Sequence, residues 1–385
     1  MNILHLIPYL GKAQGGPVES LRLLASAQSE IGHSIRVVYT GISADGEPVN
    51  FSDTVQIFHV ESYGPTRWSP KLINSALSNG FVPDVVHSHG LWLDAGRQAA
   101  KISRRLNVPH IISPCGMLQE DALRRSIWKK TLAWFAFQKR VLLSATVLHA
   151  KSDAEASGLE KIFTKLRIKV VPNSIEMPPG SHREKEVEED GKLRRCIFEE
   201  IGLTSDHRVV LFLGRIHPVK GLERLIDAWS GIFEQFPDWR LFIVGPNENG
   251  YQANLESKMT SDIGETIKFP GPIWGDKRWE AYQAANLLVA PSDFENFGQS
   301  IAEALSTGLP VITTTGTPWK ELQEKKCGWW VEPSPASIAR ALEEAMRLTD
   351  VERKAKGAIG RKIVQRFFPE SIAQEMCALY DSLIK

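Results

Sequence analysis

Short apolar runs alternate with helix-like segments along most of this chain. The apolar runs lie at 2–7, 35–39, 55–60, 85–87 and 110–113 in the first half and at 209–213, 241–244, 287–290 and 311–313 in the second. After the first run, apolar residues recur at the spacing of one helical face, as in Leu21, Leu24 and Ala27. Because strands that alternate with helices form parallel sheets covered on both faces, the pattern predicts an α/β fold.

One strand–helix–strand segment, 289–313, carries two carboxylates. Pro291 ends its first strand, and Gly308 begins the turn that ends its helix. Glu295 lies in the turn before the helix, and Glu303 lies within the helix. At a helical rise of roughly 1.5 Å per residue, their backbones are at most about 12 Å apart. This separation suits one ligand held at two points along its length, and the simpler alternative is a pair of solvated glutamates.

The residues between these glutamates supply free backbone amides. Asn296, Phe297 and Gly298 lie where the helix opens, and amides at a helix start have no intrahelical acceptor. Such amides can bind a phosphate. Gly298 also lets a ligand approach the backbone closely.

A pair of cations follows the strand 209–213. The segment reads G-R-x-x-x-x-K-G, with Arg215 and Lys220 just before a predicted helix. Two cations beside a helix N-terminus can neutralise a diphosphate and stabilise its departure. The alternative interpretation is a solvated basic loop.

Two strand ends in the first half carry further candidate chemistry. His87 and His89 end the strand 85–87 and, being two residues apart, point to the same side of an extended chain. Open α/β sheets place their chemistry at the carboxyl ends of strands, which favours a functional role for His89. For His87, a hydrogen-bonded packing role is the preferred interpretation. Gly15 and Gly16 follow the first strand, as in the phosphate-facing corner of a Rossmann-type domain.

The motif S-x-x-E-x-F-G at 292–298, followed by E-A-L and G-x-P-V-I, resembles the donor-binding segment of family 4 retaining glycosyltransferases. The resemblance covers nearly the whole chain. It implies the GT-B architecture, an α/β fold in which two Rossmann-like domains face each other across a deep cleft. The expected parts are an acceptor-binding domain at 1–172, a donor-binding domain at 173–368 and a C-terminal helix at 369–385 that crosses back to the first domain.

The same resemblance assigns roles to individual residues. It implies that Glu295 contacts the donor sugar and Glu303 the ribose of the nucleotide. Arg215 and Lys220 are implied to bind the diphosphate, and His89 to lie near the transferred sugar. His89, Arg215, Lys220 and Glu295 are thus the implied catalytic residues. The other implied donor-binding residues are Gly15, Gly16, Gly214, Gly245, Ile273, Asn296, Phe297, Gly298 and Gln299, and the implied acceptor side includes Gly116 and Met117.

The implied reaction transfers a sugar with retention of its anomeric configuration. The expected donor is a nucleotide-diphosphate sugar, with a UDP-sugar such as UDP-glucose first and a GDP-sugar next. The expected acceptor is a glycan or a lipid-linked sugar of polysaccharide or cell-envelope biosynthesis. No metal and no other cofactor is expected, because Arg215, Lys220 and the helix amides take the place of a divalent ion. Two alternatives stay open: a nucleotide-sugar 2-epimerase of the same architecture, and a non-catalytic sugar-binding protein of two lobes.

The composition agrees with a globular protein of two domains. The 385 residues are 43% hydrophobic and 24% charged. No apolar run approaches the roughly 20 residues needed to cross a bilayer, and no signal peptide is evident, so we expect a cytoplasmic location. The four cysteines show no C-x-x-C spacing, which argues against a zinc site or a disulfide framework.

Charge is divided unevenly within the formal net charge of +1. Residues 1–172 contain 20 Lys and Arg against 13 Asp and Glu, and the rest of the chain contains 26 against 32. The segment 124–143 combines basic residues with Trp128 and Trp134 at helical spacing, which fits a helix on the anionic inner face of a membrane. It fits equally a packed helix with a solvated basic face. No recognition motif accompanies the positive charge, so no nucleic-acid partner is expected.

Overall fold

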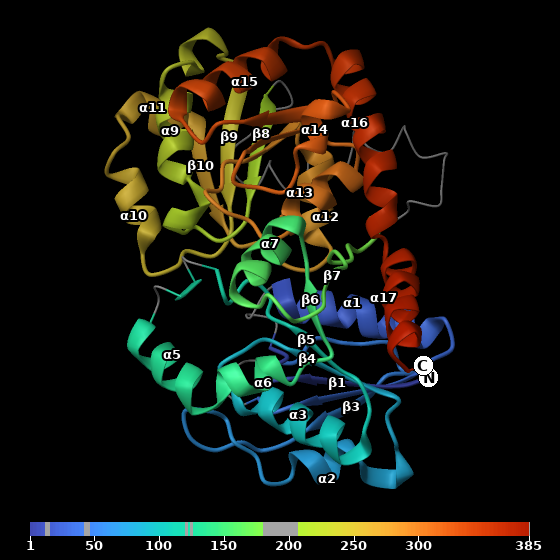
Figure 1. Cartoon of the computed structure of the whole chain (residues 1–385). Helices are drawn as coiled ribbons and strands as arrows, with labels where there is room; N and C mark the ends of the chain where they lie inside the picture. The colour runs from blue at the N-terminus through green and yellow to red at the C-terminus, as the bar shows by residue number, and fades with distance from the viewer. Residues whose placement is uncertain (12–15, 42–46, 120–121, 124–125, 180–206, 385) are drawn as a thin grey trace. The chain divides into compact units, whose positions relative to one another are not determined.

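The computed structural model describes residues 1–11, 16–41, 47–119, 122–123, 126–179 and 207–384. Contacts within the chain divide it into two compact units, Met1–Glu176 with Phe367–Lys385, and Met177–Arg366. Each unit is built on one parallel sheet (Figure 1). The C-terminal helix belongs to the first unit.

The first unit contains a seven-stranded sheet in the order β3-β2-β1-β4-β5-β6-β7. All of its strand pairs are parallel. The strand order reverses between β1 and β4, and open α/β sheets bind ligands beside the strand ends at such a switch point. The strands are β1 (Asn2–Ile7), β2 (Ser34–Tyr39), β3 (Gln56–His59), β4 (Val85–His89), β5 (His110–Ser113), β6 (Val147–Ala150) and β7 (Ile168–Val170).

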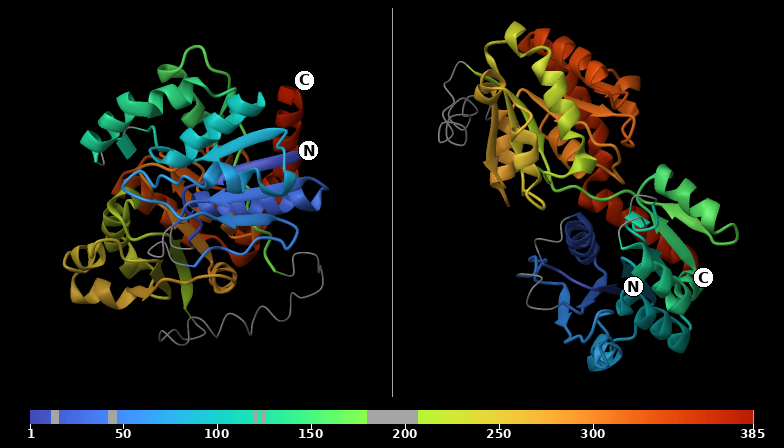
Figure 2. Two further views of the ribbon diagram at one scale, coloured as in Figure 1. Left: turned by 90° about the horizontal axis from the view of Figure 1, so that it is seen from below. Right: turned by 90° about the vertical axis from the view of Figure 1, so that its left-hand side faces the viewer.

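Helices cover both faces of this sheet. Leu4 of β1 packs in an apolar cluster with Ile102 of α3 (Asp94–Leu106), whereas His5 hydrogen-bonds Gln28 of α1 (Gly16–Glu30). Successive strand residues point to opposite faces, so α1 and α3 lie on opposite sides of the sheet. Further helices of this unit are α2 (Leu72–Ala76), α7 (Asp153–Ile162) and α17 (Pro369–Ile384), and α17 lies alongside α1 (Figures 1 and 2).

The segment expected to form one basic helix is interrupted. It consists of α5 (Ile127–Ala133), a π-helical turn (Trp134–Gln138) and α6 (Lys139–Leu143). Residues 124 and 125, where the helix was expected to begin, lie outside the described residues. Several large apolar side chains of this segment are exposed to solvent, namely Ile127, Trp128, Leu132, Phe135 and Leu143.

The second unit contains a six-stranded sheet in the order β10-β9-β8-β11-β12-β13, again with parallel pairs. Its strands are β8 (Arg208–Leu213), β9 (Trp239–Val244), β10 (Ile267–Gly271), β11 (Leu287–Ala290), β12 (Val311–Thr314) and β13 (Gly328–Val331). Its helices are α9 (Leu222–Ser230), α10 (Tyr251–Glu256), α11 (Ser261–Thr266), α12 (Lys277–Ala284), α13 (Gln299–Ser306), α14 (Glu321–Glu324), α15 (Pro335–Arg347) and α16 (Asp350–Val364).

The core of the second unit joins its sheet to α9 and α15. Leu225 of α9 and Leu342 of α15 are fully buried in one cluster with Val210 and Leu241 of the central strands. The helix α13 contacts both β11 and β12, between which it lies in the chain. The expected strand–helix–strand segment around the two glutamates is therefore present. Among the described helices, none is long and apolar enough to span a bilayer.

Candidate active site

Lys220 and Glu295 form an ion pair in the second unit. Lys220 ends a short helical turn, Pro218–Lys220, that follows β8, and Glu295 lies in the loop before α13. The Lys220 Nζ donates to Glu295 Oε1 at 2.5 Å, and the Ser292 hydroxyl donates to the same oxygen at 2.8 Å. Both members of the pair are 17% exposed. The ends of two neighbouring strands thus fix the position of this carboxylate while leaving part of it accessible.

Arg215 is more exposed than Lys220 and has its own carboxylate partner. Its guanidinium lies 2.5 Å from Glu248, which follows β9. Without a ligand, Arg215 and Lys220 are each neutralised by a glutamate from the same unit. A bound diphosphate would share or replace these carboxylates as partners of the two cations.

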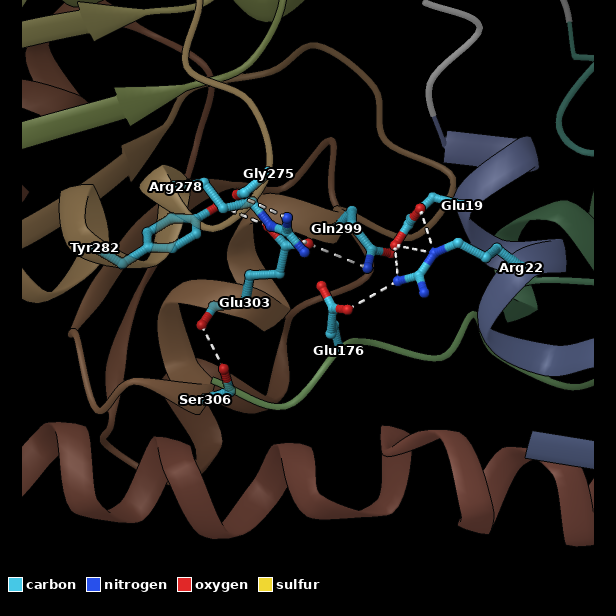
Figure 3. Close-up of polar contacts among 9 residues, drawn as sticks. All are labelled: Glu19, Arg22, Glu176, Gly275, Arg278, Tyr282, Gln299, Glu303 and Ser306. Carbon is cyan, nitrogen blue, oxygen red and sulfur yellow. Dashed lines mark hydrogen bonds and ion pairs between the residues drawn. The ribbon is translucent and has the colours of Figure 1, made fainter. Parts of the chain in front are cut away.

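Glu303 is buried on α13 and is held by donors from α12. The Tyr282 hydroxyl donates to Glu303 Oε2 at 2.9 Å, and Arg278 Nε lies 3.6 Å from Oε1 (Figure 3). Gln299 Nε2 is 3.5 Å from the same Oε1. Burial, and then the charge of Glu303, raise the pKa of Tyr282 well above its ordinary value, so the phenol keeps the proton that it donates. This arrangement keeps Glu303 in one orientation.

The start of α13 depends on Gly298. Its φ of 83° lies in the left-handed region, and a Cβ there would lie 2.9 Å from Trp319 Nε1. The Trp319 indole donates to the Phe297 carbonyl at 2.6 Å. Phe297 is buried beside that indole. Asn296 precedes Phe297 and Gly298 in the chain, and Gln299 follows them as the first residue of the helix.

Two other expected donor-site glycines touch each other through the backbone. Gly214 and Gly245 follow β8 and β9, and a Cβ on Gly245 would lie 1.8 Å from the Gly214 carbonyl oxygen. The Gly245 amide donates to the Gly271 carbonyl at the end of β10. Ile273 follows two residues later and is half-buried. Gly214, Gly245 and Ile273 therefore lie along the carboxyl ends of three adjacent strands.

The first unit brings His89 close to the expected acceptor residues. The Leu91 amide lies 3.2 Å from Met117 Sδ, and the Gly116 amide donates to Glu155 at 2.6 Å. These contacts fix the loop after β5 beside the loop after β4, where His89 ends its strand. Gly16 is the exposed first residue of α1, whereas Gly15 lies outside the described residues.

His5, His87 and His89 form a buried cluster. One nitrogen of each ring lies within 4.8 Å of the others, a spacing that a metal ion could bridge. However, both ring nitrogens of His5 and both of His87 already hydrogen-bond to other protein groups. The arrangement therefore fits a hydrogen-bonded cluster better than a cation site, and His87 has the contacts expected of a packing residue.

Family models match both halves of the chain. A model described as "Glycosyl transferase 4-like domain" matches residues 15–174, and one described as "Glycosyl transferases group 1" matches residues 194–362. The two matches together take in most of the sequence. The chain belongs to the family 4 type of glycosyltransferases.

Curated relatives carry glycosyltransferase names as well. The D-inositol 3-phosphate glycosyltransferase of Corynebacterium urealyticum is 24% identical over 379 residues, which are 92% of this chain and 82% of the relative. The enzyme of the same name from a Nocardioides species is 31% identical over 249 residues, 60% of this chain and 52% of that relative. The chain spans about half the length of this second relative.

Solved structures confirm the fold of this glycosyltransferase. Sucrose-phosphate synthase from Thermosynechococcus elongatus is similar with a TM-score of 0.78 at 20% identity, over 100% of this chain and 99% of that chain. HepE from Anabaena in complex with UDP and glucose is similar with a TM-score of 0.71 at 20% identity, over 100% of both chains. The expected α/β class with two Rossmann-like domains of the GT-B type is therefore confirmed.

The structure adds residues to this glycosyltransferase site that the sequence did not indicate. Glu248 contacts Arg215, and Ser292 contacts Glu295. Arg278 and Tyr282 contact Glu303. Ser292 could have been found, because it begins the S-x-x-E motif. The others come from different strand ends or from another helix, so no spacing in the sequence relates them to their partners.

Proposed function

We propose that this glycosyltransferase transfers a sugar with retention from a nucleotide-diphosphate sugar bound by its second unit. The observation that carries the proposal is the arrangement of two fixed carboxylates and two cations around α13 and β8. Glu295 is held by Lys220, and Glu303 is held by Tyr282. Glu295 binds the donor sugar and Glu303 the ribose, while the amides at 296–299 meet the diphosphate between them.

The first donor to test is UDP-glucose. The similar structure of Anabaena HepE is a complex with UDP and glucose, and that protein has the same fold over the whole chain. GDP-sugars come next. In the proposed site Gly214 and Gly245 allow close approach of the diphosphate, and Ile273 lies beside the base.

The acceptor is proposed to bind the first unit near His89, Gly116 and Met117. A glycan or lipid-linked sugar of polysaccharide or cell-envelope biosynthesis is the class we favour. Two curated relatives are named for D-inositol 3-phosphate, so a small phosphorylated acceptor is the second class to test. The acceptor hydroxyl attacks from the face that the diphosphate leaves, and a donor phosphate oxygen takes its proton.

Catalysis is proposed to need no metal. Arg215 and Lys220 supply the positive charge that stabilises the leaving diphosphate, which is the task of a divalent ion in metal-dependent transferases. Activity should therefore survive chelation by EDTA. Loss of activity with EDTA that magnesium or manganese restores would contradict this part of the proposal.

The deciding experiment measures products and the effect of one cation. Purified protein is incubated with UDP-glucose, with and without acceptor, and the anomeric configuration of the product is determined by NMR. Lys220→Ala should lower kcat/KM by about 3 kcal/mol in transition-state free energy, because a preorganised charge is lost. Lys258→Ala is the matched control, since Lys258 pairs with Glu223 on the exposed surface of the same unit. Wild-type turnover in Lys220→Ala contradicts the proposal, and an epimer released without acceptor supports the epimerase alternative.

A contact with an anionic membrane surface is proposed for the segment 127–143. Trp128 is 67% exposed and Phe135 is 78% exposed, although both are large and apolar. Lys129, Lys139 and Arg140 are exposed on the same segment. Exposed aromatic and cationic side chains on one short helical segment fit the interface of an anionic bilayer, where the rings enter the headgroup region and the cations contact lipid phosphates.

A further inference from the structure

A chain of buried hydrogen bonds runs through the first unit and ends at His89. It begins at the Val171 carbonyl and passes through two histidines, a serine and the C-terminal helix before it returns to β1 and β4. Its members, in order, are Val171, His149, Ser113, His87, Tyr380, Gln28, His5 and His89. Because one end is a carbonyl, which can only accept, the direction of every bond in the chain is determined.

The first three bonds follow from the Val171 carbonyl. His149 Nε2 lies 2.8 Å from it and must donate, so the neutral ring accepts at Nδ1. The Ser113 hydroxyl lies 2.7 Å from that Nδ1 and donates its single proton to it. His87 Nε2 lies 2.7 Å from the same hydroxyl oxygen and therefore donates, which leaves His87 Nδ1 as an acceptor.

The next bonds pass through the C-terminal helix. The Tyr380 hydroxyl lies 2.6 Å from His87 Nδ1 and donates to it, so the Tyr380 oxygen is an acceptor. The Gln28 side chain interacts with Tyr380, and its Nε2 lies 3.8 Å from Cys377 Sγ on the same helix and donates toward it. The amide nitrogen of Gln28 therefore faces α17, and its oxygen faces His5.

The last two bonds determine the proton on His89. His5 Nε2 lies 2.9 Å from Gln28 Oε1 and donates to it, so His5 Nδ1 accepts. His89 Nε2 lies 3.0 Å from His5 Nδ1 and donates in turn. Within the described part of the chain, no group hydrogen-bonds the remaining nitrogen, Nδ1 of His89.

We infer that this network holds His89 as the Nε2–H tautomer, with Nδ1 available as an acceptor for a substrate hydroxyl, and that His5, Gln28 and Tyr380 are positioning residues for it. The part played by the substrate rests on the proposed function, whereas the tautomer does not. His89 then accepts a hydrogen bond from the sugar or acceptor and does not protonate it.

The neutral state of the histidine rings supports the direction assigned to the hydrogen bonds of the network. Burial lowers the pKa of His5 to about 4 and the pKa values of His87, His89 and His149 well below their usual range. A reversed chain would require both nitrogens of His149 to carry protons, since Nε2 must donate to the carbonyl in either case. That would place a cation beside the buried Lys151, whose charge already disfavours protonation of His149.

The first test reads the tautomer directly. Protein labelled with ¹⁵N at histidine is examined by long-range ¹H–¹⁵N correlation at pH 7, and His89→Asn assigns the His89 signals. The expected spectrum has His89 protonated at Nε2 alone. Protonation at Nδ1, or a doubly protonated ring, overturns the inference whatever reaction the enzyme performs.

The second test removes links of the network. Gln28→Met removes both amide contacts, and Tyr380→Phe removes one hydroxyl. In each variant His89 should become a mixture of tautomers and kcat should fall on the order of ten-fold, for the loss of one well-oriented hydrogen bond. The Kd for the nucleotide diphosphate should stay at the wild-type value, because no network residue belongs to the second unit. Tyr39→Phe, a hydroxyl deletion on β2 beside His59, is the control and should change neither.

The outcomes separate the inference from the proposed function. A mixed tautomer with reduced kcat in either variant supports the positioning role, even if the other variant does not fold. A mixed tautomer with wild-type kcat overturns it, as does an unchanged tautomer in both folded variants. If the wild type has the expected tautomer but no glycosyl transfer is found, the proposed function fails and the tautomer assignment stands.

Discussion

Glu295 and Glu303 differ in their surroundings, although they lie on one short segment. Glu295 is paired with a lysine and a serine at the ends of β8 and β11 and is partly accessible. Glu303 is buried and receives the Tyr282 hydroxyl. A partly accessible carboxylate beside a cation suits contact with the donor sugar, which changes during the reaction. A buried carboxylate in a fixed orientation suits contact with the ribose, which stays bound throughout.

The two carboxylates should therefore respond differently to the same substitution. Glu295→Gln should lower kcat while the affinity for the free nucleotide diphosphate stays close to that of the wild type. The reason is that the hydrogen bond between Glu295 and the donor sugar strengthens in the transition state. Glu303→Gln should weaken nucleotide binding by roughly 1–3 kcal/mol, for one charge-assisted hydrogen bond to the ribose. Calorimetric titration of both variants with the nucleotide diphosphate measures these affinities. Loss of nucleotide binding in Glu295→Gln with none in Glu303→Gln would reverse the assignment.

At the scale of elements, the corner between β8 and β9 depends on glycine. Gly245 has a φ of 152°, and its backbone lies so close to the Gly214 carbonyl that no side chain fits. The corner is also the proposed path of the diphosphate. The same glycines thus allow both the strand packing and a close approach of ligand.

Gly245→Ala should destabilise the second unit by at least about 2 kcal/mol, because the added methyl group overlaps a backbone oxygen. Gly264→Ala is the control. Gly264 lies within α11, and a Cβ there meets nothing within 4 Å. Alanine should stabilise that helix by roughly 0.5–1 kcal/mol relative to glycine. Urea unfolding followed by circular dichroism compares the two, and equal stability of both variants would show that the corner can relax.

The segment 127–143 should attach the protein to anionic vesicles. Binding to vesicles that contain phosphatidylglycerol should exceed binding to phosphatidylcholine alone and should weaken as salt is raised, because the cations are screened. Replacing Trp128 and Phe135 together by alanine should remove most of the binding to anionic vesicles. Trp274→Ala is the control, since Trp274 is 60% exposed in the second unit. Equal binding to neutral and anionic vesicles would indicate a packed or solvated helix instead.

At the scale of the whole molecule, buried neutral histidines make the stability depend on pH. Burial lowers the pKa of His5 to about 4 and that of His110 to about 3. In the unfolded chain these rings titrate near 6.5. The unfolded state therefore binds more protons below that pH, and the folded state loses stability as the pH falls.

The free energy of unfolding should drop between pH 7 and pH 5, before most carboxylates titrate. Each ring that stays neutral in the folded state contributes a loss of up to about 2 kcal/mol by pH 5. Urea unfolding at these two pH values, at constant ionic strength, measures the sum. A free energy that is independent of pH over this range would show that the rings are protonated in the folded protein.

The sequence by itself determined the α/β class, the parallel strands and the segment that carries the two glutamates. These features rest on local patterns, because strand and helix periods and motifs such as G-R-x-x-x-x-K-G occupy only a few successive residues. The roles of Arg215, Lys220, Glu295 and Glu303 were inferred from such motifs and remain predictions. The ends of helices and the breaks within them were less predictable, as the π-helical turn within 127–143 shows.

Only the tertiary structure decided which groups surround these residues. Tyr282 meets Glu303 from another helix, Glu248 meets Arg215 from another strand end, and Tyr380 meets His87 across 293 positions of the chain. No periodicity relates such partners, because their distance depends on how strands are ordered in a sheet and on where the C-terminal helix packs. The protonation state inferred for His89 is of this kind, since it follows from a carbonyl on Val171 through contacts that the folded sheet and α17 create.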